Sequence, residues 1–328
     1  MPEGMEGLDA RAYARNRIAN LAKEFAWSEA SDDQWCEALR ARLREVIGLP
    51  TERVPLNPET LNSEAFAGYR RDTVTFSSRE GLRVFGYLLV PENLTAPAPA
   101  IVCIPGHGNG VDCIVGIEPD DYQNDFAIQS VQVGFMTLAI EPIGFGHRKA
   151  AADRDRYSSC NGDSMAALVL GETMIAWRVH DALIALDYLS LLPNVNPKEL
   201  GMMGISGGGL VAFWAACLDE RVAATVVSGY FNTFFDSILG IDHCVDNYAP
   251  EMAKVVEMPD MAALIAPRKL FVESGIQDHI FPIEAFRGAC EKAQRIYLDS
   301  DSFQSHEFEG GHEFNGTQAL PQMKKWLA

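Results

Sequence analysis

The stretch that decides the fold is Gly201-Met202-Met203-Gly204-Ile205-Ser206-Gly207-Gly208-Gly209. Residues 200–204 predict a short buried strand, and the apolar run 210–217 predicts a helix. Between them, residues 204–208 fit the pattern G-x-S-x-G, in which the serine occupies a strained turn and its neighbours must be small so that backbone and helix can approach. We therefore predict that Ser206 exposes its hydroxyl at a helix N-terminus, where free N–H groups favour negative charge.

Two other interpretations of this stretch are weaker. A flexible linker would not lie between an apolar strand and an apolar helix. A dinucleotide-binding loop of the form G-x-G-x-x-G needs a second glycine where Ser206 stands, because the pyrophosphate approaches the backbone closely there. The serine turn is favoured if an acid and then a histidine follow along the chain.

Composition excludes several classes of function. The chain has 328 residues, of which 48% are hydrophobic, so it can bury a large core. A formal net charge of −18 and the lack of a basic run disfavour a nucleic-acid partner. The acidic start, residues 1–6, lacks the form of a signal peptide, and no apolar run has the length of a membrane span.

Seven cysteines are scattered without C-x-x-C spacing: Cys36, Cys103, Cys113, Cys160, Cys217, Cys244 and Cys290. Their odd number and the absence of an export signal predict reduced thiols and a cytoplasmic location. The run Asp242-His243-Cys244-Val245-Asp246 contains metal-binding residue types, but adjacent residues chelate poorly, so we expect no metal. No cofactor is expected.

The order of the predicted elements indicates an α/β fold. Residues 1–66 read as an N-terminal helical extension, with helical spacing over 8–47 and a loop over 48–66. This extension would pack on the main domain or on a second subunit, so a homo-oligomer is compatible with the sequence. From residue 67 to 328 strands alternate with helices, including a long helix over 166–191 and a late strand at 296–298. This pattern predicts a mostly parallel sheet covered on both faces, with a short cap-like insertion over about 230–259.

Candidate partners of Ser206 follow it in the required order. Asp278 comes in the loop after the predicted strand 269–274, on the edge where open α/β sheets hold ligands. His312 follows two glycines and precedes the last helix, so a tight loop can bring its imidazole to the serine. Glu273 is the weaker candidate for the acid, and His279 and His306 are alternatives for the histidine.

Acyl transfer also requires N–H groups that stabilise an oxyanion. The amide of Gly207, directly after the serine, is the first candidate. The second is expected from the glycine-rich loop after the strand 100–104, where we favour the amide of His107 and then that of Gly108. The aromatic residues Tyr230, Phe231, Phe234 and Phe235 follow the strand ending at Ser228, and we expect them to wall the substrate pocket.

These motifs together resemble the α/β-hydrolase superfamily from about Asp72 to the C-terminus, and within it the dienelactone-hydrolase-like and acetyl-xylan-esterase-like bacterial esterases. The segments Trp177-Arg178-x-x-Asp181-Ala182 and 228–232 add to this resemblance. Two positions depart from it, since Pro105 stands where relatives usually carry histidine and Ser206 replaces the cysteine of dienelactone hydrolases. The resemblance implies ester hydrolysis more firmly than any one substrate.

The sequence therefore predicts a serine carboxylesterase for small acyl esters that needs only its substrate as partner. A peptidase, an amidase or a lactone hydrolase of the same superfamily is the alternative enzyme. A hydrolase-like binding protein is disfavoured because all three candidate catalytic residues are retained.

Overall fold

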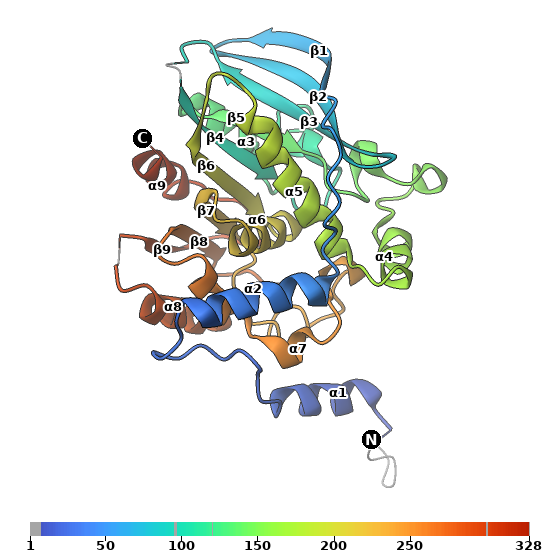
Figure 1. Ribbon diagram of the computed structural model, residues 1–328, viewed down its shortest axis with the longest axis vertical. Coiled ribbons are helices and arrows are strands. Elements are labelled where there is room, and N and C mark those ends of the chain that lie inside the picture. The colour runs from blue at the N-terminus through green and yellow to red at the C-terminus, as the bar shows by residue number, and fades with distance from the viewer. Residues whose placement is uncertain (1–7, 95–96, 120, 300, 328) are drawn as a thin grey trace.

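The computed structural model describes residues 8–94, 97–119, 121–299 and 301–327. Its centre is one nine-stranded sheet with the order β1-β2-β3-β5-β4-β6-β7-β8-β9 (Figure 1). The strands are β1 (Glu59–Phe66), β2 (Tyr69–Arg79), β3 (Leu82–Pro91), β4 (Ala98–Ile104), β5 (Met136–Ile140), β6 (Val195–Ile205), β7 (Val222–Ser228), β8 (Lys269–Gly275) and β9 (Phe303–Phe308).

The sheet is parallel where it carries the predicted chemistry. Strands β5, β4, β6, β7, β8 and β9 pair in parallel, whereas β1, β2 and β3 form an antiparallel meander that joins β5. The carboxyl ends of β6, β7 and β8 therefore meet at one edge, where open α/β sheets bind ligands. The predicted α/β-hydrolase fold is confirmed.

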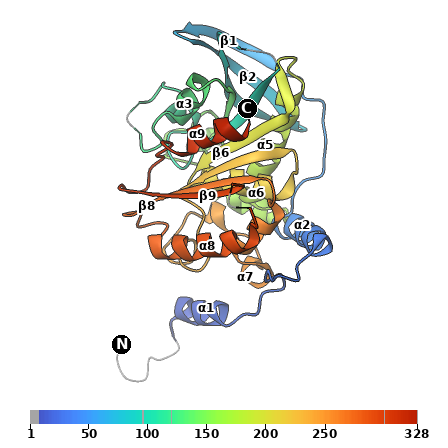
Figure 2. The same cartoon turned by 90° about the vertical axis from the view of Figure 1, so that its left-hand side faces the viewer.

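Helices cover both faces of the sheet, and each face has its own apolar core. The helices are α1 (Ala10–Ala19), α2 (Asp33–Ile47), α3 (Phe126–Gln132), α4 (Cys160–Val169), α5 (Met174–Ser190), α6 (Gly207–Leu218), α7 (Met252–Val255), α8 (Ile283–Ile296) and α9 (Ala319–Trp326). Side chains of α2, α5, α6 and α8 bury one face, and those of α3 and α9 bury the other. Figure 2 shows α9 and α8 on opposite sides of β8 and β9.

Two predicted elements after residue 160 were wrong. The helix over 166–191 is interrupted, because Gly171 adopts a φ of 78° and separates α4 from α5. The strand predicted at 296–298 does not form, since α8 continues to Ile296. The last strand is β9, whose alternating burial (buried at both ends and mostly polar between them) gave a weak apolar signal.

The N-terminal region also differs from its prediction. Within the predicted helical range 8–47 the chain forms α1 and α2, and α2 begins where Asp32 accepts a hydrogen bond from the Trp35 N–H at 3.0 Å. The second half of the predicted loop 48–66 is β1, which pairs with β2. β1 is exposed over nearly all its length, so burial leaves no apolar pattern in its sequence.

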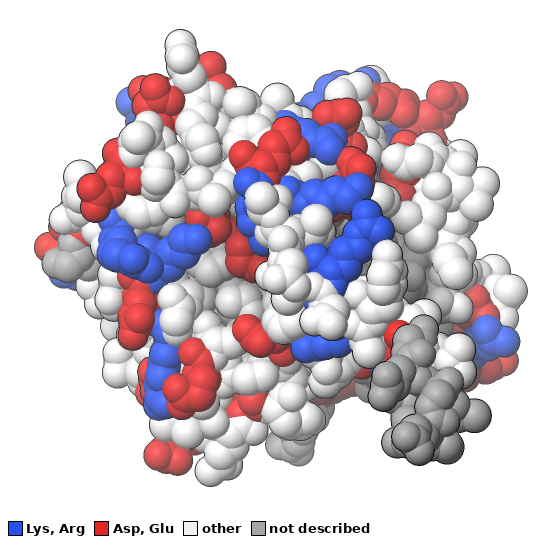
Figure 3. Space-filling view, turned by 90° about the horizontal axis from the view of Figure 1, so that it is seen from below, with Lys and Arg blue, Asp and Glu red and all other residues white. Residues whose placement is uncertain are grey.

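The N-terminal extension packs on the cap-like insertion. The N–H groups of Glu24 and Phe25 donate to the carbonyls of Lys254 and Val255 at 2.8 Å each. Basic and acidic side chains lie beside one another on this side of the molecule (Figure 3), as in the ion pairs of Arg11 with Asp242 and of Arg42 with Glu251, both at 2.7 Å.

The acidic start, residues 1–6, lies outside the described residues. Within the described ranges, no helix is both long and apolar enough to cross a membrane.

We predict that α2 folds as one unit with the sheet. Leu43 of α2 is completely buried, so Leu43→Ala should lower the free energy of unfolding by about 2–5 kcal/mol in urea denaturation. The control Val169→Ala, at a position 88% exposed, should change it by less than about 0.5 kcal/mol. A separate early transition of the N-terminal region in the Leu43→Ala variant would contradict this.

Candidate active site

Ser206 lies in a strained turn between β6 and α6. Its φ of 55° and ψ of −125° fall outside the regions that non-glycine residues normally adopt. Its neighbours must be glycine, because a Cβ on Gly204 would collide with the backbone of Gly208, and one on Gly208 would collide with the carbonyl of Ile104. This is the geometry that the G-x-S-x-G pattern predicts.

The loops after β8 and β9 bring Asp278 and His312 together. His312 Nδ1 lies 2.7 Å from Asp278 Oδ2, and the Asp278 carboxylate is also fixed by the N–H groups of Ile280 and Phe281 at 2.8 and 3.0 Å. The imidazole is stacked between Tyr122 and Phe281, each with its ring centroid 5.6 Å away. His312 Nε2 is buried and has no hydrogen-bond partner among the described residues.

One cavity of about 320 Å³ contains both Ser206 and His312 in its lining. The remaining lining residues come from the loop after β4, the turn before α3, the segment before α4, the cap and the loop after β8: His107, Tyr122, Tyr157, Ile241, Asp242, His243, Cys244 and Ile280. Burial lowers the pKa of His243 to about 4, which favours its neutral imidazole, and both its ring nitrogens are buried without a partner in the described chain.

Tyr122 is a site residue that sequence reasoning did not single out. Its hydroxyl donates to the His107 carbonyl at 2.7 Å and also hydrogen-bonds with Ser206. The same side chain therefore touches the serine, stacks on the histidine and holds the loop after β4. No local motif marks it, because it lies in a turn before α3 and reaches the site only through the fold.

The rival residues have other contacts. Glu273 is completely buried and accepts hydrogen bonds from the Ser228 hydroxyl at 2.9 Å and from the Asn315 amide at 3.0 Å. His306 Nδ1 lies 4.0 Å from Glu273, and His279 is exposed. Neither histidine lines the cavity with Ser206. Through its hydrogen bonds, Glu273 connects the end of β7 to the loop after β9.

The loop after β4 lies directly against the serine turn. The Gly106 N–H donates to Gln123 at 2.7 Å, and a Cβ on Gly106 would lie 2.9 Å from the Cβ of Ser206. A Cβ on Gly207 would lie 3.0 Å from His107 Nδ1, so the His107 side chain packs directly against Gly207. Gly108, the further candidate, is near Gln123.

The His107 side chain connects this loop to the cap and to α5. His107 Nε2 lies 3.0 Å from Asp246 Oδ2, and Arg178 Nη1 donates to the same oxygen at 2.6 Å. Burial raises the pKa of the Asp246 carboxyl, but the charges of Arg178 and His107 outweigh burial and hold this pKa well below its usual range. An ionised carboxylate of the cap thus fixes the loop beside Ser206.

The same network brings together residue types that bind metals. They come from separate segments of the chain, so the spacing of neighbouring residues in the sequence did not predict this group. Donor atoms of His107, Cys160, Cys244 and Asp246 lie within 4.8 Å of one another. The Arg178 guanidinium donates to both Asp246 and Cys160 Sγ, the latter at 3.0 Å. A fixed positive charge therefore already faces these groups, which opposes a second cation at the same place.

The aromatic residues predicted to wall the pocket do not line the cavity with Ser206, and this prediction is corrected. Tyr230 and Phe231 are 1% exposed, with their rings packed on Phe281 and on Phe213. Phe235 lies under the Arg15 guanidinium, 4.5 Å from its ring centroid. Phe234 faces a different cavity.

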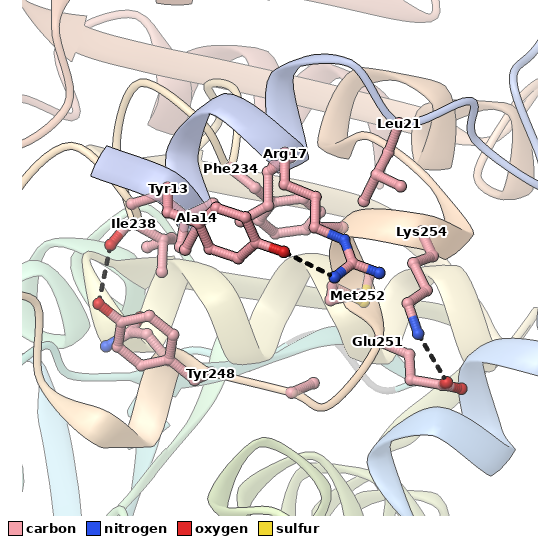
Figure 4. Close-up of a pocket in the computed structure, with 15 residues that line it drawn as sticks. Tyr13, Ala14, Arg17, Leu21, Phe234, Ile238, Tyr248, Glu251, Met252 and Lys254 are labelled. Carbon is pink, nitrogen blue, oxygen red and sulfur yellow. Dashed lines mark hydrogen bonds and ion pairs between the residues drawn. The ribbon is translucent and has the colours of Figure 1, made fainter. Parts of the chain in front are cut away.

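This other cavity, of about 420 Å³, lies between α1 and the cap (Figure 4). Tyr13, Arg17 and Leu21 line it from the N-terminal segment, and Phe234, Ile238 and Met252 line it from the cap. It contains none of Ser206, Asp278 and His312. The dense aromatic run at the start of the cap therefore serves its attachment to the core and to α1.

Glu141 and the side chain of Arg148 are buried and brace the loop after β5. Glu141 is 1% exposed and accepts the N–H groups of Val111 at 2.9 Å and His147 at 3.1 Å. Arg148 pairs with Asp181 of α5 at 2.6 Å. Burial raises the pKa of Glu141 to about 7, although the two N–H groups lower it.

The fold and the arrangement at the end of β6 define the class of protein as an α/β-hydrolase. The family model described as "Abhydrolase family" matches residues 15–230, and the chain belongs to this family. A model of the BAAT and acyl-CoA thioester hydrolase C-terminal region matches residues 184–292.

The chain is similar to several known proteins. The Bacillus subtilis protein YtaP, named as a hydrolase, is 27% identical over 301 residues, which are 88% of this chain and 98% of YtaP. A Bacteroides fragilis protein named for acetyl xylan esterase has a similar structure, with a TM-score of 0.82, 18% identity and coverage of 97% and 94% of the two chains. A glucuronoyl esterase from Solibacter usitatus has a TM-score of 0.70, 16% identity and coverage of 94% and 100%.

We predict a pH-dependent stability contribution from Glu141. Because its folded pKa of about 7 exceeds its ordinary value of 4.5, the folded protein binds a proton that the unfolded chain has released. Stability should fall as pH rises through this window, by up to about 3 kcal/mol.

The test compares the free energy of unfolding of the wild type and Glu141→Gln in urea, from about pH 4.5 to pH 7.5. The variant loses one acceptor, so it should be less stable at low pH, and the difference should shrink as pH rises. Glu92 is exposed, so Glu92→Gln is the control. Its free energy of unfolding should differ from that of the wild type by the same amount at every pH. A Glu141→Gln difference independent of pH would refute the shifted pKa.

Proposed function

We propose that this chain is a serine carboxylesterase that hydrolyses small acyl esters. The observation that carries the proposal is the position of His312, which holds Asp278 at 2.7 Å through Nδ1 while sharing a cavity with Ser206. The nucleophile Ser206, the orienting acid Asp278 and the base His312 follow one another along the chain in the order that α/β-hydrolases have. The names of the structurally similar esterases support the same reaction class.

In the proposed mechanism the Ser206 hydroxyl leaves its contact with Tyr122 and passes its proton to His312 Nε2 as Oγ attacks the ester carbonyl. Asp278 stabilises the imidazolium and keeps its orientation. The amides of Gly207 and of His107 or Gly108 donate to the tetrahedral oxyanion. His312 then protonates the leaving alcohol, and the acyl-enzyme is hydrolysed by a water that His312 activates.

The size of the cavity supports short acyl groups. Ile280 and Ile241 are its aliphatic lining residues, and Tyr157 and His243 add polar groups. A buried methylene contributes about 0.8 kcal/mol of binding only while space remains, so longer chains lose this gain in a cavity of this size.

The seven free cysteines support the proposed cytoplasmic location.

A second candidate is thioester hydrolysis. The match of residues 184–292 to the acyl-CoA thioester hydrolase C-terminal region favours it. The same serine, histidine and oxyanion donors would serve, since both substrates present an acyl carbonyl. Parallel assays with acetyl esters and acyl-thioesters of equal chain length distinguish the two.

We predict that Ser206→Ala abolishes ester turnover while the fold stays intact. The wild type should be labelled covalently by a fluorophosphonate probe at Ser206, and the variant should not be labelled. Asp278→Asn should lower kcat by about 10³-fold or more, and adding it to Ser206→Ala should reduce activity little further, because the three residues act as one unit.

The control for this experiment is Glu273→Gln, which changes the rival carboxylate. Its labelling rate should stay closer to wild type than that of Asp278→Asn, at matched folded fraction in circular dichroism. Wild-type turnover in pure Ser206→Ala, or a larger loss in Glu273→Gln than in Asp278→Asn, would refute the assigned roles.

We also predict that kcat/KM falls with acyl length beyond about four carbons, because the cavity is small. Measurements with nitrophenyl esters of increasing chain length check this. Ile280→Ala enlarges the lining and should shift the optimum to longer chains. Phe234→Ala, which opens the cavity beside α1, should leave the optimum unchanged. A wild-type optimum at ten or more carbons would exclude the small-acyl proposal.

A further inference from the structure

The cysteine pair Cys160 and Cys244 lies beside the cavity of Ser206 and has no role in the proposed hydrolysis. Cys244 lies in the cap and lines that cavity, whereas Cys160 lies behind it and is 1% exposed. The two sulfur atoms are within 4.8 Å, and the thiols hydrogen-bond to each other. Residues far apart in the sequence are thus brought close enough for a covalent bond after a small movement.

Three features of the structure stabilise a thiolate at Cys160. It is the first residue of α4, so its sulfur lies at the positive end of a helix. Arg178, which is 5% exposed, donates to Cys160 Sγ at 3.0 Å. The third is the hydrogen bond from Cys244.

The other cysteines have none of this arrangement. The hydrogen bond from Cys244, together with the charge of Arg178, lowers the pKa of Cys160 to about 7, although burial raises it. Burial instead raises the pKa of Cys103, Cys113 and Cys290 to about 12 each. Burial also raises the pKa of Cys36, which is partly exposed and does not line the cavity of Ser206.

We propose that Cys160 and Cys244 form a reversible redox modification site, which hydroperoxides oxidise to a disulfide. Cys244 is the member that a small peroxide in the cavity reaches, and the buried Cys160 is its resolving partner. The bond would tie the first turn of α4 to the cap, two residues before the Asp246 that holds the oxyanion loop.

The chemistry balances with hydrogen peroxide as the oxidant. The Cys160 thiolate takes the Cys244 proton along their hydrogen bond, and the Cys244 thiolate attacks one peroxide oxygen. The O–O bond breaks, Cys244 becomes a sulfenic acid, and the released hydroxide takes the proton back from Cys160 to form water. The Cys160 thiolate then attacks the Cys244 sulfur and expels hydroxide, which leaves the disulfide.

The network around the pair favours this oxidation over metal binding. Arg178 donates to Cys160 and to Asp246, and Asp246 also pairs with His107 at 3.0 Å. The negative groups are therefore already neutralised by a residue of the chain. A bound cation would lie against the guanidinium, whereas disulfide formation removes only the thiolate charge.

The test treats the full-length protein with increasing hydrogen peroxide, blocks the remaining thiols with iodoacetamide and maps the peptides by mass spectrometry. We expect a Cys160–Cys244 crosslink at a peroxide concentration roughly tenfold or more below that which oxidises Cys36, because the Cys160 thiolate can accept the Cys244 proton and then attack the sulfenic acid, whereas burial raises the pKa of Cys36. Dithiothreitol should reverse it. The readout is independent of ester turnover, so it stands apart from the proposed hydrolysis.

Variants complete the design. Cys160→Ser and Cys244→Ser should each abolish the crosslink, and Cys290→Ser, in α8, should leave it unchanged. The wild type alone can overturn the proposal, whether or not the variants fold. It does so if Cys160 and Cys244 are both alkylated after a peroxide treatment that oxidises Cys36. Bound zinc in the purified protein, whose removal is required before oxidation, would also overturn it and assign the cluster to a metal.

Discussion

The turn at Ser206 is the constraint on which the rest of the site depends. Holding a serine at positive φ costs about 1–3 kcal/mol, and the surrounding structure must offset that cost. The Ser206 N–H donates to the Ser228 carbonyl of β7 at 3.0 Å, and α6 begins at the next residue. The apolar helix α6 is buried along nearly its whole length, so its burial against the sheet supplies the stabilisation that keeps the turn strained.

Once this turn is fixed, the register of the parallel strands determines what surrounds it. Ile205 pairs with Ser228, and Ser228 pairs with Glu273, so β6, β7 and β8 end side by side. Gly229 then has a φ of 52° and must be small, since a Cβ there would lie 3.1 Å from the His312 ring. The site is thus assembled by strand ends and short loops, and its long-range precision comes from the sheet.

Sequence patterns predicted the parts of this arrangement that are local. Ser206 and Asp278 each follow a predicted strand, and His312 follows two glycines before the last helix, so their positions at one sheet edge could be inferred. Tyr122 and the pair of Cys160 and Cys244 could not, because only tertiary contacts bring them to the cavity. The same limit explains Phe231 and Phe234, since an aromatic run shows that side chains are buried and leaves open which cavity they face.

β1 and β9 were missed for a different physical reason. β1 is exposed over most of its length at the edge of the sheet, and β9 alternates between buried and partly exposed residues, so neither has the continuous apolar run of a buried strand. Edge strands are stabilised mainly by backbone pairing with a neighbour, which their own side chains do not encode. The central strands, buried on both faces, were the ones that apolar runs identified.

The cap insertion is held from two sides, and this determines how it contributes to the site. On its outer side, Arg15 donates to the Leu239 carbonyl and Lys23 donates to that of Ala253 at 2.7 Å. On its inner side, Asp246 binds Arg178 of α5 and His107 of the loop after β4. One buried carboxylate therefore connects the cap to the loop beside Ser206. The N-terminal extension, which carries none of the proposed catalytic groups, supports that carboxylate by fixing the segment that bears it.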